Sequence, residues 1–176
     1  MEGRARKVPR EVVRRQYEDF LKLKVELKRN PIDFTPVSIH NNPNKPHCIV
    51  VDIDGTIADS NGVRNIYDFG KVHLDIPIYD VIESIVNFDG DVIICSGRDE
   101  RCRVQTEEWL RRYIPFERLY LRDNKDNRAD WEVKEEFWND ICDDYYVTMM
   151  FDDRLQVVRR ARALRFKVAN VKYGYY

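Results

Sequence analysis

The sequence lacks a long uninterrupted hydrophobic run, and this absence excludes two classes of protein. A membrane-spanning helix needs about 18 or more consecutive apolar residues, and no stretch of this chain approaches that length. The Arg-rich beginning of the chain has no apolar segment behind it of the kind that a secretory signal carries. We therefore expect no membrane partner and a cytoplasmic location.

Motifs built on cysteine, histidine or a glycine-rich loop are also missing. The four cysteines lie far apart with no CxxC pair, which favours reduced structural thiols over a zinc site or a disulfide framework. The three histidines show no metal-site spacing. No GxxxxGKS or GxxxxGKT sequence occurs, so the P-loop nucleoside triphosphatases are excluded.

Charge is balanced over the whole chain but is distributed unevenly along it. Residues 1–30 hold 10 basic and 5 acidic side chains, and residues 154–176 hold 7 basic and none acidic. The segment between them carries 13 basic against 26 acidic side chains. Because nonspecific duplex binding needs a continuous basic face, this acidic segment argues against it as the main activity. The basic ends suit either a grip on a few phosphates or the solvated faces of terminal helices.

The 176 residues divide by pattern into two parts. Residues 1–47 predict an amphipathic helix over 10–29, followed by a Pro- and Asn-rich linker. Residues 48–176 alternate short β-branched runs with helical stretches. Strands are expected at 48–53, 92–95, 119–121, 147–151 and 166–171, and helices at 78–88, 101–113, 131–142 and 155–164. This alternation predicts an α/β domain, a parallel sheet of about five strands with helices on both faces.

Polar side chains gather where the predicted strands end, which is where ligands bind in parallel α/β sheets. Asp52-Ile53-Asp54-Gly55-Thr56 follows the first strand, Ser96-Gly97-Arg98 the second, and Asp152-Asp153-Arg154 the fourth. The helix before the fourth strand begins with Asp130 and carries Lys134 one turn later. Four carboxylates meeting at one edge raise each other's pKa unless a cation neutralises them. Oxygen ligands without His or Cys fit Mg²⁺. We expect Mg²⁺ at Asp52, Asp54, Asp152 and Asp153.

Each of these groups alone has a simpler interpretation. The Asp-x-Asp sequence is also typical of a turn, and Asp152-Asp153 is also typical of the N-terminus of a helix. Lys134 lies among glutamates with which it can form ion pairs. Their shared position at the ends of strands favours a catalytic site.

The set Asp52-x-Asp54-Gly55-Thr56, Ser96, Lys134 and Asp152-Asp153 resembles the four motifs of the haloacid dehalogenase-type phosphatases. Within that superfamily, residues 49–173 resemble the 3′-phosphatase domain of phage polynucleotide kinase-phosphatase, on Ser96-Gly97-Arg98, Asp130-x-x-x-Lys134-Glu135-Glu136-x-Trp138 and Asp152-Asp153-Arg154-x-Gln156-Val157-Val158. The resemblance implies a Rossmann-like fold with a minimal cap. No P-loop is present, so the 5′-kinase activity of the bifunctional relatives is not carried over.

The resemblance also implies a role for each candidate residue. Asp52 attacks phosphorus to form an aspartyl-phosphate, and Asp54 moves the protons. Lys134 and Ser96 hold phosphoryl oxygens. The further residues expected to bind substrate are Arg98, Thr56, Gly97, Asp130 and Arg64. Arg64 is the candidate for the family's arginine after Asn-Gly, because Val63 occupies that position here.

The short connections between the predicted strands and helices indicate the size of the substrate. Only 21 residues separate Thr56 from Ile78, so there is no room for a separately folded lid, and an open pocket accepts the end of a polymer. We expect a Mg²⁺-dependent phosphomonoesterase that removes a terminal 3′-phosphate from DNA or RNA. The alternatives are a nucleoside-monophosphate phosphatase and, more distantly, a non-catalytic module that binds nucleic-acid ends. The resemblance further implies a partner kinase or ligase and, for a phage-encoded protein, the host cytoplasm.

Overall fold

A computed structural model describes residues 18, 39, 41–65 and 67–171. Contacts divide the chain into two units, Met1–Thr35 and Pro36–Tyr176, of which only the second is described at length. Of the helix expected at 10–29, only Glu18 is described, and it is helical; the rest lies outside the described residues. The division expected at residue 47 stays a prediction. No helix in the described part of the chain has the length and apolar character needed to cross a bilayer.

The second unit is built on a five-stranded sheet in which every neighbouring pair of strands is parallel. Its strands, in spatial order, are β5 (Arg118–Arg122), β4 (Asp91–Asp99), β1 (His47–Val51), β6 (Tyr146–Asp152) and β7 (Val168–Asn170). The chain starts in the middle of the sheet, extends to one edge and returns to the other. This reversal places the carboxyl ends of β1, β4 and β6 next to one another.

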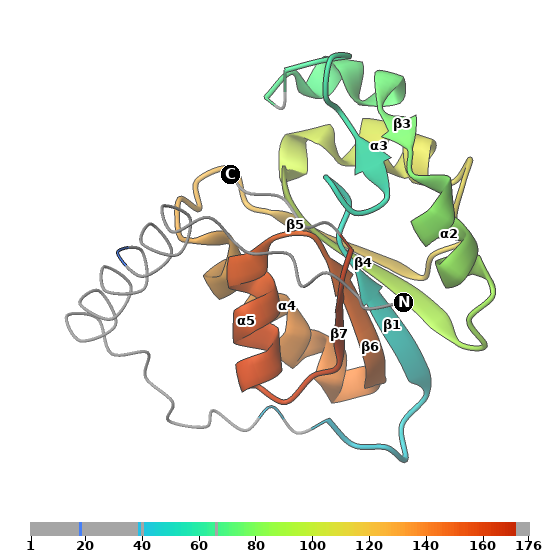
Figure 1. Ribbon diagram of the computed structural model, residues 1–176, viewed down its shortest axis with the longest axis vertical. Helices are drawn as coiled ribbons and strands as arrows, with labels where there is room; N and C mark the ends of the chain where they lie inside the picture. Colours follow the sequence, from blue (N-terminus) through green and yellow to red (C-terminus); the bar gives the residue numbers. More distant parts are fainter. Residues whose placement is uncertain (1–17, 19–38, 40, 66, 172–176) are drawn as a thin grey trace, which may run out of the picture. The chain divides into compact units, whose positions relative to one another are not determined.

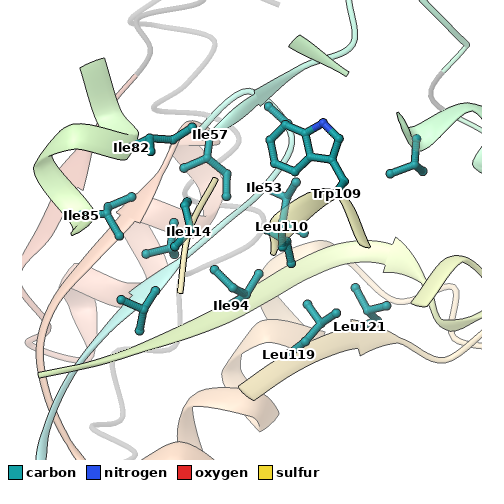
Figure 2. Packing of buried hydrophobic residues seen from close by; sticks show 14 of the residues in the cluster. Ile53, Ile57, Ile82, Ile85, Ile94, Trp109, Leu110, Ile114, Leu119 and Leu121 are labelled. Carbon is teal, nitrogen blue, oxygen red and sulfur yellow. The ribbon is translucent and has the colours of Figure 1, made fainter. Parts of the chain in front are cut away.

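Helices cover both faces of the sheet, as Figure 1 shows. α2 (Tyr79–Val86) and α3 (Arg103–Leu110) pack on one face, and α4 (Asp130–Asp144) and α5 (Leu155–Ala163) pack on the other. Successive residues of a strand point to opposite faces. Ile94 therefore joins the α2 and α3 side, shown in Figure 2, whereas Ile93 and Cys95 join the α4 and α5 side.

A small insertion between β1 and α2 is all that forms a cap among the described residues. It contains two antiparallel strands of two residues each, β2 (Ala58–Asp59) and β3 (Ile76–Pro77), and the 3₁₀ helix η1 (Phe69–Leu74) between them. A second 3₁₀ helix, η2 (Glu100–Cys102), joins β4 to α3. The insertion is too short to fold separately, and it packs on α3 instead.

The predicted fold class is confirmed, including the five parallel strands, the helices on both faces and the minimal cap. Several expected boundaries are wrong by two or more residues: β1 ends at Val51 and not at 53, α3 covers Arg103–Leu110 and not 101–113, and β7 covers Val168–Asn170 and not 166–171. The end of β4 matters most for the site. Ser96, Gly97 and Arg98 were expected after the second strand, but β4 continues to Asp99. Asp99 still pairs with Arg122 after a shift in register, and this irregular pairing extends the strand beyond its apolar run.

Candidate active site

The carboxyl end of β1 leads into a tight turn that carries two of the predicted carboxylates. Asp52 is 5% exposed, and its amide donates to the carbonyl of Phe151 in β6 at 3.0 Å. The carbonyl of Ile53 then accepts hydrogen bonds from three successive amides, at 3.1, 2.9 and 2.9 Å. Gly55 lies in this turn at φ +80°, a left-handed conformation that costs glycine little. The turn fixes Asp52 and Asp54 at the edge of the sheet.

Lys134 connects the carboxylates that follow two neighbouring strands. Its ammonium lies 2.8 Å from Oδ1 of Asp52 and 2.8 Å from Oδ2 of Asp152, and all three side chains are buried. Burial, opposed by Lys134 and reinforced by Asp152, raises the pKa of Asp52 to about 8. Burial also works against the charge of Lys134, but the surrounding carboxylates outweigh it and hold the pKa of Lys134 well above its usual value. A buried ammonium therefore stays charged between two carboxyl groups.

Asp52, Asp152 and Asp153 form a group suited to a metal ion, because one carboxylate oxygen of each lies within 4.8 Å of the others. Because the neighbouring Asp152 is one of the causes that raise the pKa of Asp52, a divalent cation bound among these carboxylates would favour the ionised form of Asp52. Gly55 gives Asp153 its place in this group, since a Cβ at Gly55 would lie 2.2 Å from Oδ2 of Asp153. The all-oxygen donor set fits Mg²⁺.

Asp54, the fourth carboxylate expected to bind Mg²⁺, is not part of this group, and arginine side chains hold its carboxylate instead. Nε and Nη2 of Arg98 lie 2.8 and 2.7 Å from its two oxygens, and Nη2 of Arg64 lies 3.4 Å from Oδ1. Burial raises the pKa of Asp54, but Arg98 and Arg64 outweigh burial, so that the pKa lies below its ordinary value. Asp54 is therefore ionised and fixed in orientation. Its side chain is 27% exposed and reaches the cleft described below.

Asp75 completes this network and was not identified from the sequence. Its carboxylate is fully buried and accepts hydrogen bonds from Nε of Arg64 and Nη2 of Arg98, both at 2.5 Å. Its backbone carbonyl accepts a hydrogen bond from the indole of Trp109 in α3 at 2.9 Å. Asp75 lies between η1 and β3, where no apolar run marks the end of a strand.

Thr56 and Ser96 lie near the acidic centre, the group formed by Asp52, Asp152 and Asp153. The hydroxyl of Thr56, which is fully buried, donates to Oδ2 of Asp52 at 3.2 Å. Oγ of Ser96 accepts a hydrogen bond from the amide of Arg98 at 3.2 Å. Thr56 therefore contacts the predicted nucleophile, Asp52, and Ser96 contacts Arg98, the arginine that binds Asp54.

Asp130 and Gly97 fit against each other. A Cβ at Gly97 would lie 2.4 Å from Oδ1 of Asp130, so only glycine lets the start of α4 approach β4 this closely. Three cations surround Asp130: Arg122 at 3.1 Å, Arg154 at 3.3 Å and Lys134 at 3.5 Å. Burial works against its charge, but these cations outweigh it and lower its pKa.

An open cleft of about 640 Å³ lies above the carboxyl ends of the strands. Its lining includes six predicted site residues: Asp52, Asp54, Ser96, Gly97, Arg98 and Asp130. The lining residues outside the predicted set include Tyr67, Phe69, Arg101, Arg122, Arg128 and Arg154. The cleft thus reaches Asp52, whereas Asp152, Asp153 and Lys134 are not among its lining residues, and it is large enough for more than a phosphate group.

The comparisons with known proteins agree with this arrangement. The family described as the polynucleotide kinase PNKP phosphatase domain matches residues 46–176. The chain belongs to this family. A protein of Autographa californica nuclear polyhedrosis virus, described as a bifunctional polynucleotide kinase/RNA ligase, is 30% identical over 163 residues, which is 88% of this chain. The expected superfamily and its polynucleotide kinase-phosphatase branch are therefore confirmed.

Solved structures of the Pnkp1/Rnl/Hen1 RNA repair complex contain chains similar to this phosphatase domain. In two of them the TM-scores are 0.72 and 0.71, each at 31% identity, over 81% and 82% of this chain. The match covers 47% and 52% of those chains and 22% of the viral relative. This chain therefore spans about half, or less, of the relatives that it matches.

Two of the cleft residues to which the sequence analysis gave no role, Arg122 and Arg154, carried a signal. Arg122 immediately follows the strand expected at 119–121, and Arg154 immediately follows Asp153. Both residues lie at the carboxyl ends of strands, where ligands bind in parallel α/β sheets. Tyr67 and Asp75 follow no strand of the sheet, so this principle does not identify them.

Proposed function

We propose that this phosphatase domain is a Mg²⁺-dependent phosphomonoesterase that removes a terminal 3′-phosphate from a polynucleotide through an aspartyl-phosphate. The observation that carries the proposal is the position of Asp52. It lies 2.8 Å from the Lys134 ammonium and within 4.8 Å of two further carboxylates, on the floor of an open cleft. A carboxylate in this setting is suited to attack a phosphorus whose charge the neighbouring cations offset.

In the first step, an oxygen of Asp52 forms a bond to phosphorus while the bond from phosphorus to the 3′-oxygen breaks. Asp54 donates a proton to the departing oxygen, and it later takes one from the water that hydrolyses the aspartyl-phosphate. The bidentate contact from Arg98 holds Asp54 in one orientation for both transfers. Because its lowered pKa leaves Asp54 ionised before substrate binds, Asp54 takes up a proton from solvent through the cleft before the first of these transfers.

Asp52, Asp152 and Asp153 would hold Mg²⁺, which when bound supplies positive charge that offsets the repulsion between Asp52 and the phosphate. Lys134 and the amides of the turn after β1 supply further donors to the transferring group. In the described part of the chain, Nη1 of Arg98 is buried without a hydrogen-bond partner. A phosphate oxygen bound there would satisfy this donor, in agreement with the expected role of Arg98.

The cleft supports a polymer end as substrate because the insertion beside it is too short to enclose a small molecule. The half-exposed Arg154, whose guanidinium contacts Asp130 at 3.3 Å, is available to pair with a phosphate. The similarity to chains of an RNA repair complex favours an RNA end and a place beside kinase and ligase activities.

The test is release of inorganic phosphate from a 3′-phosphorylated oligonucleotide, compared with 3′- and 5′-mononucleotides, with and without Mg²⁺. We expect fastest release from the oligonucleotide and none without Mg²⁺. Faster release from mononucleotides would support the nucleoside-monophosphate phosphatase instead. Binding of the oligonucleotide without any release would support the non-catalytic module.

A further inference from the structure

Tyr67 is the most exposed of the large hydrophobic side chains in the described part of the chain, at 76%. A single exposed aromatic residue on a protein surface needs no explanation by itself. Tyr67, however, lines the same cleft as Asp52 and Asp54, whose other lining residues are mostly charged or amides. An aromatic face beside a phosphate-binding floor is the combination with which proteins bind single-stranded nucleic acids.

The backbone that carries Tyr67 is fixed to the acidic centre through a short series of contacts. The amide of Tyr67 donates to Oδ1 of Asn65 at 2.9 Å, and the amide of Asp68 donates to the carbonyl of Asn65 at 2.9 Å. Nη1 of the neighbouring Arg64 also donates to that carbonyl, at 3.2 Å. Arg64 is buried and pairs with Asp54 as described above.

On the other side of Tyr67, Phe69 packs against the hydrophobic core while also lining the cleft. The segment is thus held by a buried ion pair before Tyr67 and by core packing after it. A backbone held in place before substrate arrives loses little conformational freedom on binding.

We infer that Tyr67 is the stacking platform for the 3′-terminal nucleobase of the substrate, an inference that rests on the proposed function. The terminal phosphate lies over Asp52, and the base of the same nucleotide lies on the exposed face of Tyr67. Stacking is tolerant of sequence because every base has an aromatic face, so the site accepts all four terminal bases at similar rates.

The experiment compares two oligonucleotides with a 3′-phosphate, one ending in an ordinary nucleotide and one whose terminal residue is a stable abasic analogue. Tyr67→Ala is expected to lower kcat/KM for the first by about 5- to 100-fold, mainly through KM, and to leave the second unchanged. Tyr67→Phe is expected to retain wild-type kinetics with both. An equal loss on both substrates, or no loss on either, would overturn the inference.

Tyr79 provides the matched control. It is 58% exposed and lies in α2, but its ring forms an edge-to-face pair with Tyr113, with centroids 6.4 Å apart, and it does not line the cleft. Tyr79→Ala is expected to behave as wild type with both oligonucleotides. A loss with Tyr79→Ala equal to that with Tyr67→Ala would contradict a specific role for Tyr67.

A binding measurement separates this inference from the proposed function. The probe is an oligonucleotide that ends in 2-aminopurine and carries a 3′-phosphate. Its fluorescence is expected to fall when it binds the Asp52→Asn variant, and not when it binds the double variant that carries both Asp52→Asn and Tyr67→Ala. Equal quenching by both proteins would overturn the stacking inference. Quenching that depends on Tyr67, together with a wild type that releases no phosphate, would contradict the proposed function and uphold the stacking site.

Discussion

One nitrogen of Arg98 bridges two carboxylates: Nη2 lies 2.5 Å from Oδ2 of the fully buried Asp75 and 2.7 Å from Oδ1 of Asp54. Asp75 therefore holds Arg98 in the position from which Arg98 donates hydrogen bonds to both carboxylate oxygens of Asp54. Asp75 also binds Arg64, so this carboxylate outside the cleft lining contacts both buried guanidinium groups, and Asp54 is their second carboxylate partner.

We predict that Asp75→Ala lowers the free energy of unfolding by about 3 to 5 kcal/mol, since it leaves these cations without their buried partner. It should also lower kcat, with a smaller effect on KM, because Asp54 loses its fixed orientation. Urea unfolding and steady-state kinetics measure the two effects. Asp144→Ala, which removes the partly exposed partner of Arg118, is the control and should cost less than about 1 kcal/mol. Equal losses in stability would contradict this account of Asp75.

Gly55 and Gly62 offer a matched pair of substitutions. Both have a left-handed backbone, at φ +80° and +74°, so alanine costs about 1 to 2 kcal/mol at either position. A Cβ at Gly55 would also lie 2.2 Å from Oδ2 of Asp153, whereas nothing lies within 4 Å of a Cβ at Gly62. We predict that only Gly55→Ala raises the Mg²⁺ concentration needed for half-maximal turnover. The same Mg²⁺ dependence in both variants would show that the fit of Gly55 to Asp153 does not matter for the metal.

Removal of the metal should abolish turnover and lower thermal stability together. At a Mg²⁺ concentration 100 times its Kd, binding stabilises the folded state by about 2.7 kcal/mol. We predict that EDTA removes this increment in a thermal melt and that Mg²⁺ restores both stability and phosphate release. Asp153→Asn should show a smaller increase in melting temperature with Mg²⁺ than wild type. An unchanged increase would remove Asp153 from the metal site.

Lys134 tests the charge balance of the acidic centre. Lys134→Met keeps the aliphatic chain and removes the ammonium that lies 2.8 Å from both Asp52 and Asp152. We predict a fall in kcat of about 100- to 1,000-fold at saturating Mg²⁺. Lys71→Met removes an exposed ammonium paired with Asp68 and should leave kcat unchanged. Wild-type kcat in Lys134→Met would mean that Lys134 serves only the fold.

The sequence predicts the sheet and its helices well because each element is long enough to show its own periodicity. Ile49, Val51 and Ile94 face one core and the residues beside them face the other, so the central strands appear in the sequence as continuous β-branched apolar runs. The rule that sites follow strand ends then brings Asp52 and Asp152 to one edge, and the structure places them on either side of Lys134.

The contacts of Arg98 could not be predicted in the same way. Its partner Asp75 lies between two elements too short to show a pattern, η1 and the two-residue strand β3. The pairing exists because the insertion folds back toward β4, a tertiary event that no local spacing encodes. The exposure of Tyr67 to the cleft depends on the same fold of the insertion.

The central claim is that the carboxylate of Asp52 attacks the phosphate. The most direct measurement is the initial rate of phosphate release from a 3′-phosphorylated oligonucleotide at saturating Mg²⁺, for the wild type and for Asp52→Asn. The account predicts a fall of about 10⁴-fold or more, with the fold unchanged by circular dichroism. A rate for Asp52→Asn within about tenfold of wild type, too small a loss for the attacking group, would contradict it.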